Sequence, residues 1–322
     1  MDKKAKIYLA GHRGLVGSAL MRQLDRQGYT NIVTRIHSEL DLTDQLAVEH
    51  FFKTEKPEYV FLAAAKVGGI KANNIYPAEF IHDNLAIQTN VIHQSYVYGV
   101  KRLLFLGSSC IYPRECPQPI KEEYFLTGPL EPTNRPYALA KIAGIEMCWS
   151  YNRQYKTQFL ATMPTNLYGP GDNYHLENSH VIPALIRKFH EAKENKQPAV
   201  TVWGTGTPKR EFMYSDDMAE ACIFAINLAD DTFKSVTAFN RNDGLPPLLN
   251  LGSNSELAIS ELASIVKKIV GFEGKIIFDN KKPDGTMQKL MDSSQLNKLG
   301  WSGKTSLREG LYKTYQDFIK SI

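Results

Sequence analysis

The sequence predicts an α/β protein built on a doubly wound parallel sheet, with a smaller α/β domain at the C-terminal end. Three observations favour this class: apolar runs alternate with helical patterns in the first half, a glycine-rich turn follows the first run, and proline and glycine gather after Pro164. The chain has 322 residues, of which 43% are hydrophobic and 22% charged. That is enough for a large core in roughly one or two domains.

In the first half, short apolar runs that read as strands alternate with helical segments. The run at 59–64 is continuously apolar, as expected of a strand in a parallel sheet that helices cover on both faces. We expect strands at residues 6–10, 31–35, 59–64 and 103–106, and helices at residues 15–27, 44–54 and about 85–98.

The second half is richer in turns. Proline and glycine gather at 169–171, 204–208 and 245–247, which indicates a loop-rich region. We expect helices at 260–270 and 306–319, and the second opens with Ser306-x-x-Glu309, a capping box. We therefore divide the chain into a first domain at 1–170, to which about 212–252 returns, and a second domain at 171–322.

The composition excludes several classes of protein. The net charge is +4 and the basic residues form no long run, so neither nucleic acid nor a membrane surface is an expected partner. The four cysteines form no C-x-x-C pair and no metal-ligand spacing, which favours reduced thiols and no bound metal. No apolar segment approaches the roughly 18 residues of a membrane span, and we expect a cytoplasmic protein.

A glycine-rich turn lies directly after the first predicted strand and opens the first predicted helix. Its spacing, G-x-x-G-x-x-G, lets backbone amides approach a pyrophosphate at the positive end of the helix. The alternative is a tight strand–helix turn without a ligand, but the flanking strand and helix favour a dinucleotide-binding (Rossmann) domain. The turn consists of Gly11, His12, Arg13, Gly14, Leu15, Val16 and Gly17.

The end of the second predicted strand indicates which dinucleotide binds. An acidic residue there would accept the ribose hydroxyl of NAD, whereas this chain has Arg35. Arg35 and Arg13 can pair with a 2'-phosphate, so we expect NADP(H), although both arginines could instead be solvated surface residues. Asp41 and Leu42 are expected near the adenine.

Tyr137 and Lys141 are four residues apart, so on a helix the phenol and the ammonium share one face. A phenol has a pKa of about 10, and a neighbouring cation would lower it toward the neutral range needed for proton transfer. Ser108, at the end of the strand at 103–106, can bond the same substrate oxygen. Together the three can move a proton while a nicotinamide moves a hydride.

With these motifs the chain resembles the extended short-chain dehydrogenase/reductase family. The resemblance is most specific to members that epimerise a GDP-linked 4-keto-6-deoxymannose at the two carbons flanking the ketone and then reduce the ketone with NADPH. It rests on the segments GSSCIYP, LEPTNRPYALAKIAG, MPTNLYGPGDN, NSHVIPALIRKFHEAK, WGTGTPKREFMYSDDMA and KPDGTMQKL. One departure is visible, because Leu15 stands where the family commonly has Met, a volume-conserving exchange.

The resemblance implies that Cys110 and His180 form the acid–base pair for epimerisation. A thiolate can remove a proton at neutral pH if a cation lowers its pKa, and an imidazolium can return the proton from the opposite face. In an extended backbone Ser108 and Cys110 would point into one cavity. The alternatives are that Cys110 is a small buried filler and His180 a loop residue. Cys148 and Cys222 are expected to be packing residues.

The resemblance also implies the substrate contacts. Lys188 and Arg210 would bind the diphosphate and Trp203 would stack near the guanine, although Trp203 could be a core residue and Arg187 could replace Lys188. Further contacts are Asn166 with the sugar or diphosphate and Asp284 with the ribose. The nicotinamide end of the cofactor would meet Lys141, Pro164, Thr165, Asn166, Leu167 and His180.

Two rival functions remain open from the sequence. One is a nucleotide-sugar epimerase or dehydratase of the same family that keeps its NAD bound; dehydratases generally carry acidic groups where this chain has Cys110 and Ile111. The other is a non-catalytic NADP-sensing module, which the intact Ser108, Tyr137 and Lys141 disfavour. The expected partners are a GDP-sugar substrate and a second copy of the chain, since the family usually forms homodimers through two helices per subunit.

Overall fold

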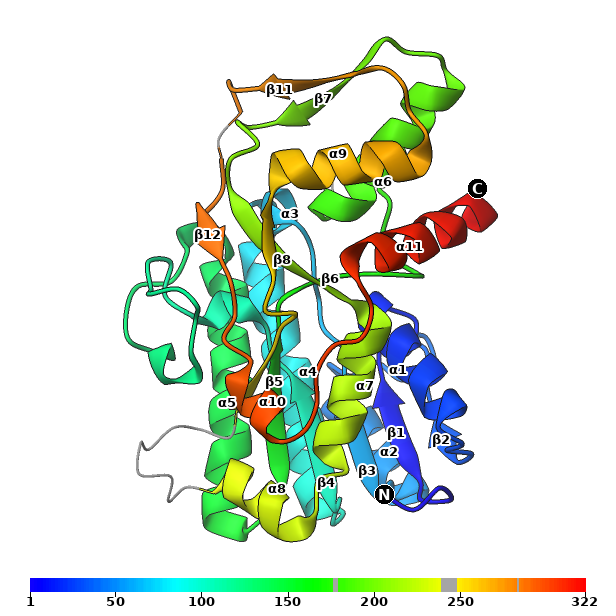
Figure 1. The fold of residues 1–322 in the computed structure, drawn as a ribbon. Helices are drawn as coiled ribbons and strands as arrows, with labels where there is room; N and C mark the ends of the chain where they lie inside the picture. Colours follow the sequence, from blue (N-terminus) through cyan, green and yellow to red (C-terminus); the bar gives the residue numbers. More distant parts are fainter. Residues whose placement is uncertain (176–178, 239–247, 283) are drawn as a thin grey trace.

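The computed structural model describes residues 1–175, 179–238, 248–282 and 284–322. Its larger part is a six-stranded sheet in the order β2-β1-β3-β4-β5-β9, and every neighbouring pair is parallel (Figure 1). This confirms the predicted fold class. The strands are β1 (Ile7–Ala10), β2 (Ile32–Val33), β3 (Tyr59–Leu62), β4 (Arg102–Leu106), β5 (Phe159–Pro164) and β9 (Leu248–Leu251).

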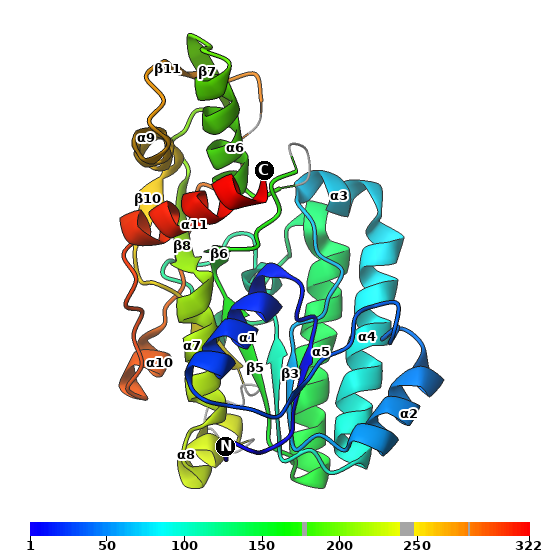
Figure 2. The ribbon, with the colours of Figure 1, turned by 90° about the vertical axis from the view of Figure 1, so that its right-hand side faces the viewer.

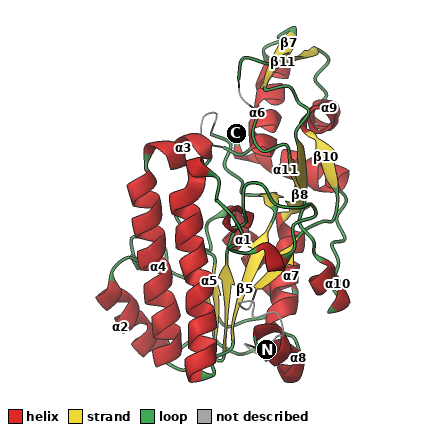
Figure 3. Cartoon of the chain, turned by 90° about the vertical axis from the view of Figure 1, so that its left-hand side faces the viewer, coloured by secondary structure: helices red, strands yellow, loops and turns green. Residues whose placement is uncertain are grey.

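Helices cover both faces of this sheet (Figure 3). Alternate residues of β1 face opposite layers: Tyr8 and Ala10 join one apolar cluster, and Ile7 and Leu9 join the other. The helices that pack on the first cluster are α2 (Gln45–Glu55), α4 (Pro77–Val97) and α5 (Arg135–Tyr155). Those on the second are α1 (Leu15–Arg26), α7 (Ser215–Ile226) and α8 (Asp230–Thr237).

Two predicted elements have different bounds in the structure. The strand expected at 31–35 is only Ile32–Val33. The helix expected from about residue 85 begins at Pro77, after the short helix α3 (Ile70–Ile75). Proline in the first turn of a helix costs no hydrogen bond, since the amides there have no partner within the helix. Pro77 can therefore start this helix, eight residues before the predicted beginning.

The smaller lobe lies beyond the ends of β4 and β5 (Figures 1 and 2). Its helices α6 (Val181–Glu194), α9 (Ile259–Val270) and α11 (Leu307–Ser321) share one apolar cluster. One small sheet pairs β7 (Ala199–Trp203) with β11 (Lys275–Asp279). The other is centred on β8 (Lys209–Tyr214), which pairs with β6 (Asn166–Tyr168), β10 (Glu256–Ala258) and β12 (Gln288–Lys289). A short helix, α10 (Ser294–Lys298), follows.

The capping box predicted before α11 is half formed. The hydroxyl of Ser306 accepts a hydrogen bond from the amide of Glu309 at 3.3 Å, as a cap should. The carboxylate of Glu309 accepts instead from Lys313, one turn along the helix, at 2.7 Å. The start of the helix was predicted correctly, while the reciprocal bond is replaced by an ion pair.

The division of the chain at residue 170 stays a prediction. Two elements of the segment at about 212–252 belong to the larger part: α7 packs on the sheet, and β9 is one of its strands. The proline-rich turn predicted at 245–247 lies outside the described residues. Within the described ranges, no helix combines the length and the apolar character needed to cross a bilayer.

Candidate active site

The glycine-rich turn packs too closely for side chains at two of its positions. Gly11 has φ +85°, and a Cβ there would lie 2.6 Å from the amide nitrogen of Ala64. A Cβ on Gly17 would lie 2.0 Å from the carbonyl oxygen of Gly11. Gly14 caps α1 without a side-chain hydrogen bond, so the first amides of this helix are open to an anion.

The turn also contains a buried polar atom that is available for a hydrogen bond to a ligand. The Nδ1 atom of His12 is buried and has no hydrogen bond to any residue that the structure describes. Burial and the charge of Arg13 lower the pKa of this imidazole, which therefore stays neutral. Leu15 opens α1, and Val16 packs against the core beneath it. An open helix end and an unpaired buried nitrogen fit the pyrophosphate and ribose of a dinucleotide.

The side chain of Arg35 is fixed by contacts with three neighbouring residues. Its guanidinium lies 2.5 Å from Glu55 of α2, donates to the carbonyl of Thr34 at 2.8 Å and lies over the ring of Phe51. Arg13 is exposed. The guanidinium of Arg35 is thus oriented by a carboxylate, whereas Arg13 is an exposed residue, and the predicted contact of both with a 2'-phosphate stays a prediction.

The segment after β2 is folded by local hydrogen bonds. The carboxylate of Asp41 accepts from the amide and the hydroxyl of Thr43, at 2.9 and 2.8 Å, and these bonds lower its pKa. Leu42 is buried, and its carbonyl accepts from Asn90 of α4 at 2.9 Å. Asp41 is therefore fixed at the surface with its charge intact.

The strand β4 ends in a tight turn that carries Ser108 and Cys110. We expected an extended backbone, but Ser109–Ile111 forms a 3-10 turn. The reason is local: the hydroxyl of Ser108 accepts from the amide of Cys110 at 3.4 Å and caps the turn, as serine does at the start of a helix. The extended geometry was wrong. The hydroxyl nevertheless also bonds the thiol, so the two groups still lie together.

Lys141 lies one turn after Tyr137 on α5 and is almost completely buried, with 3% of its surface exposed. Its ammonium donates to the carbonyl oxygen of Leu106 at 2.8 Å and lies 5.8 Å from the centre of the Tyr137 ring. Burial lowers the pKa of Lys141 to about 8, and the nearby Cys110 acts in the opposite direction. Because this pKa is only slightly above neutral pH, the ammonium is still mostly protonated there.

The pKa of Tyr137 differs from our expectation. Burial raises it well above its usual value, the charge of a Cys110 thiolate would raise it further, and a hydrogen bond with Ser108 lowers it. We expected a lowered pKa because of the adjacent ammonium, but desolvation of the phenolate outweighs the attraction. In this state Tyr137 is a hydrogen-bond donor and a proton source.

Cys110 lies at the centre of this group. It is 7% exposed, and burial raises the pKa of its thiol. The groups that lower this pKa are, in order, Lys289, the hydroxyl of Ser108 and Lys141. Lys289, on β12, was not predicted from the sequence. It lies in the quoted segment KPDGTMQKL, but nothing in its spacing distinguishes it from a surface lysine.

His180 immediately precedes α6, and its carbonyl accepts the first helical hydrogen bond, from Ala184 at 3.0 Å. The residue is exposed, yet the protein that surrounds the imidazole removes part of its solvation and lowers its pKa. Within the described residues, no hydrogen bond or ion pair joins His180 to Cys110 or Tyr137. The opposed arrangement of thiol and imidazole therefore stays a prediction.

Trp203 is a surface residue. It ends β7 with 64% of its surface exposed, so the alternative that it belongs to the core is wrong. The ammonium groups of Lys188 and Lys282 each lie 5.3 Å from its ring centre, and Lys188 also donates to the carbonyl of Thr201. An exposed indole can stack on a base, and the two ammonium groups near its ring bring positive charge for phosphates.

Arg210 and Asp284 lie on neighbouring segments of the same lobe. Burial lowers the pKa of the Arg210 guanidinium, and the charge of Asp284 raises it. Asp284 accepts from the amide and the hydroxyl of Thr205, at 3.0 and 2.7 Å. The side-chain amide of Asn166 donates to the carbonyl of Glu211 at 2.9 Å.

The segment that follows β5 links the two lobes. Pro164 is the last residue of β5, and the amide of Thr165 donates to the carbonyl of Leu251 at 2.9 Å. Leu167 packs on the same core as α1. The structure thus joins Ser108, Cys110, Tyr137 and Lys141 in one group at the end of β4, and Lys188 and Trp203 in another on the smaller lobe.

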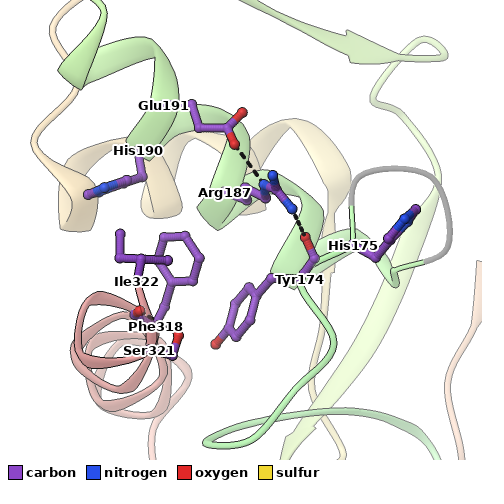
Figure 4. Close-up of a pocket in the computed structure, with 8 residues that line it drawn as sticks. All are labelled: Tyr174, His175, Arg187, His190, Glu191, Phe318, Ser321 and Ile322. Atoms are coloured by element: carbon purple, nitrogen blue, oxygen red, sulfur yellow. Dashed lines mark hydrogen bonds and ion pairs between the residues drawn. The ribbon is translucent and has the colours of Figure 1, made fainter.

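A cavity of about 460 Å³ lies between α6 and α11 (Figure 4), and no residue of either group lines it. Arg187 points into this region, where it donates to Glu191 and to the carbonyl of Tyr174, at 2.7 and 3.0 Å. Arg187 is thus engaged elsewhere, whereas Lys188 contacts Trp203. The described residues that line the cavity are Tyr174, His175, Arg187, His190, Glu191, Phe318, Ser321 and Ile322, and of these only Arg187 was considered from the sequence, as the alternative to Lys188.

The chain is similar to known proteins over its whole length. Residues 7–238 match the profile of the NAD dependent epimerase/dehydratase family. GDP-L-fucose synthase 1 of Arabidopsis thaliana is 59% identical over 321 residues, 100% of this chain and 95% of that relative. A GDP-6-OMe-4-keto-L-xylo-heptose reductase from C. jejuni is 40% identical with a TM-score of 0.93, covering 100% of this chain and 99% of that one. A GDP-L-fucose synthetase from Naegleria fowleri bound to NADP is 26% identical with a TM-score of 0.87, covering 100% and 96%.

Proposed function

Because the chain belongs to the NAD dependent epimerase/dehydratase family, we propose that it converts GDP-4-keto-6-deoxy-D-mannose to GDP-L-fucose with NADPH. The observation that carries this proposal is the grouping of Ser108, Cys110, Tyr137 and Lys141 at the end of β4. Ser108, Tyr137 and Lys141 are suited to proton transfer during the reduction of a ketone. Reduction alone does not require a further base, so the thiol of Cys110 favours an additional epimerisation step. Identity of 59% to a GDP-L-fucose synthase supports the same reaction.

The residues of the glycine-rich turn, together with Arg35 and Arg13, hold NADP(H). The uncapped start of α1 receives the pyrophosphate, and the guanidinium of Arg35 binds the 2'-phosphate. Asp41 and Leu42 border the adenine, and Lys141 and the segment from Pro164 to Leu167 border the nicotinamide. When bound, the reduced nicotinamide supplies the hydride for the ketone carbon.

Epimerisation requires a base, an acid and a stabilised enolate. Tyr137 and Ser108 donate hydrogen bonds to the ketone oxygen and stabilise the negative charge that forms when a neighbouring C–H proton is removed. Cys110 removes that proton as a thiolate, and His180 returns a proton to the other face of the carbon. The thiol then releases its proton to solvent and the imidazole takes one up, and repetition at the second flanking carbon inverts both centres. The lowered pKa of His180 means that its imidazolium gives up its proton readily in this second role.

Reduction then uses the same hydrogen-bond donors. The raised pKa of Tyr137 keeps its proton on the phenol until the ketone oxygen becomes an alkoxide, to which the phenol transfers it. The ammonium of Lys141, held by the carbonyl of Leu106, stabilises the phenolate that remains. One site thus performs all three steps without moving the sugar.

The smaller lobe binds the nucleotide. The indole of Trp203 stacks on the guanine, Lys188 and Arg210 pair with the diphosphate, and Asp284 accepts from the ribose hydroxyls. Asn166, between the lobes, contacts the sugar or the diphosphate. Residues 1–170 with the returning segment at about 212–252 therefore form the cofactor domain, and residues 171–322 form the substrate domain.

The enzyme acts as a cytoplasmic homodimer, and its two subunits contact each other through α4 and α5. Tyr96 of α4 stacks on Tyr155 of α5 with ring centres 4.1 Å apart. Val97, Leu139 and Tyr155 on these helices expose 50%, 43% and 44% of their surface, and a second copy of the chain would cover this apolar surface. Its four cysteines are unpaired, as expected in a reducing compartment. Light scattering should give the mass of a dimer, and a monomer would contradict this assembly.

The proposed reaction is tested by stoichiometry. Incubation with GDP-4-keto-6-deoxy-D-mannose should oxidise one equivalent of NADPH for each GDP-L-fucose formed. An epimerase that retains its NAD would give product without net oxidation, and an NADP-sensing module would give no product. A related 4-keto heptose linked to GDP, run in parallel, should turn over more slowly; preference for the heptose would reject the assigned sugar.

A further inference from the structure

The turn at residues 108–111, which we call the catalytic turn, is anchored at its far end by Tyr112. This residue follows the turn directly and lies two positions after Cys110. It is buried, and its hydroxyl donates to the side-chain oxygen of Asn250 at 2.6 Å. Burial raises the pKa of Tyr112, and the charge of Glu122 raises it further, so the phenol keeps the proton that it donates.

Asn250, which accepts this bond, is the centre of a buried hydrogen-bond network. It belongs to β9 and has no exposed surface. Its side-chain amide donates to two carbonyls, that of Ile120 at 2.9 Å and that of Asp292 at 3.2 Å. Its backbone amide donates to the buried carboxylate of Glu122 at 3.0 Å. The oxygen and the nitrogen of the Asn250 side chain are thus both used within the protein, and they reach three different segments.

Two of these segments connect the network to the smaller lobe. The amide of Ile120 donates to the carbonyl of Leu290 at 2.7 Å, and the amide of Asp292 donates back to the carbonyl of Ile120 at 2.8 Å. Leu290 directly follows β12, which pairs with β8. The side-chain amide of Asn250 thereby joins β9 of the larger sheet to the chain that leaves β12.

The residue after Asn250 fixes the segment that we expect at the nicotinamide. The carbonyl of Leu251 accepts from the amide of Thr165 at 2.9 Å, directly after the point where β5 ends at Pro164. In the parallel pairing of β5 with β9, Pro164 lies opposite Leu251. One end of β9 therefore sets the positions of both the catalytic turn and the cofactor segment.

We propose that Tyr112 and Asn250 are positioning residues whose hydrogen bond holds Ser108 and Cys110 in a fixed place relative to the nicotinamide and the sugar. This inference rests on the proposed function, in which both groups act on one sugar ring. Apolar packing is non-directional and would keep the turn buried without fixing its place, whereas a short buried hydrogen bond fixes both distance and direction. A displacement of about 1 Å in reacting groups can reduce a rate by on the order of 100-fold.

The anchoring of the turn can be measured without substrate. Iodoacetamide alkylates each cysteine at a rate that depends on access to its thiolate, and mass spectrometry of peptides assigns the rate to each position. Tyr112→Phe removes only the hydroxyl, so alkylation of Cys110 at a fixed pH should become about fivefold faster or more, while the buried Cys148 should react as in the wild type. Tyr29→Phe is the matched control, because this buried hydroxyl accepts from Asn227 at 2.9 Å and belongs to the other apolar cluster.

Turnover of GDP-4-keto-6-deoxy-D-mannose is the second readout. In Tyr112→Phe, kcat and deuterium uptake into the sugar should fall together by about tenfold or more, because Ser108 and Cys110 shift together. The KM for the GDP-sugar and the Kd for NADPH should stay within about twofold. A residue that contributes only to stability would lower the melting temperature and leave kcat unchanged below it. Asn250→Asp, which has the same shape but lacks the amide donor, should give the same pattern and replaces the Phe variant if that protein does not fold.

Unchanged alkylation of Cys110 in a folded variant would overturn the proposal, and so would faster alkylation with a normal kcat. A wild type that never acts on the GDP-sugar would instead reject the proposed function. In that case faster alkylation in Tyr112→Phe would still support the anchoring of the turn, and an unchanged rate would reject it.

Discussion

The ammonium of Lys141 donates a hydrogen bond to the carbonyl oxygen of Leu106 at 2.8 Å, and this contact joins α5 to the end of β4. Leu106 lies two residues before Ser108, so the bond sets the position of the Tyr137 helix relative to the serine turn. The same carbonyl keeps the buried ammonium hydrogen-bonded, which limits the cost of its burial. The catalytic geometry thus depends on one backbone oxygen of the sheet.

The buried Lys141 should make stability depend on pH. Its pKa is about 8 in the folded protein against 10.5 as the reference, so between these values the unfolded chain binds more protons. The contribution of Lys141 to the unfolding free energy therefore rises with pH in that range. From pH 8 to 9.5, the stability of the wild type relative to Lys141→Met should rise by on the order of 1 kcal/mol. Urea unfolding at the two pH values measures this, with the exposed Lys53→Met as control; a constant difference would contradict the burial argument.

Cys110 should be required for epimerisation and not for cofactor binding. Cys110→Ala removes the base, so deuterium uptake from solvent into the sugar should fall to background while NADPH affinity stays within about twofold. Cys116→Ala is the matched control, since this half-buried thiol lies six residues away and outside the catalytic group. Mass spectrometry of the recovered sugar measures the exchange. Normal exchange in Cys110→Ala would remove this residue from the mechanism.

Much of this catalytic group could be predicted because its signals are local. The Tyr137–Lys141 spacing is a property of one helix turn, and the steric demands on Gly11 and Gly17 are properties of one turn after a strand. Lys289 could not be found in this way. Its charge lowers the pKa of Cys110, and its strand β12 is placed by pairing with β8 and with the segment around Ile120, contacts that are distant in the sequence.

Two local interpretations failed for identifiable reasons. The serine turn was read as extended because an apolar strand precedes it, but the Ser108 hydroxyl caps a 3-10 turn. The phenol of Tyr137 was expected to have a lowered pKa, but burial, which no short motif reveals, determines the direction. Both errors concern the local surroundings of the predicted residues, whose roles stay predictions.

Arg35 should discriminate between the two nicotinamide dinucleotides. Arg35→Ala removes the guanidinium expected to pair with the 2'-phosphate, and a charge-assisted bidentate contact of this kind contributes about 1.5–3 kcal/mol. The Kd for NADPH should therefore rise at least tenfold, with less than a threefold change for NADH, as measured by fluorescence titration. Arg26→Ala on α1, whose guanidinium pairs with Asp216, is the control. Equal losses for both dinucleotides would reject the phosphate contact.

Trp203 should contribute to substrate affinity but not to the stability of the fold. The side chain is 64% exposed, so Trp203→Ala should change the unfolding free energy by less than about 0.5 kcal/mol. Loss of aromatic stacking should raise the KM for the GDP-sugar about tenfold and leave kcat nearly unchanged. Tyr312→Ala, on the exposed side of α11, is the matched control at 57% exposure. A KM that stays at the wild-type value would place the guanine elsewhere.

Both thiol chemistry and hydride transfer are tested together by one turnover experiment in deuterated water. The enzyme, NADPH and GDP-4-keto-6-deoxy-D-mannose are allowed to react, and the GDP-L-fucose is analysed by NMR and mass spectrometry. We predict deuterium at both carbons that flank the former ketone, hydrogen from NADPH at the reduced carbon, and one NADPH consumed per product. A reduced product that carries hydrogen at both flanking carbons and has kept their original configuration would contradict the account.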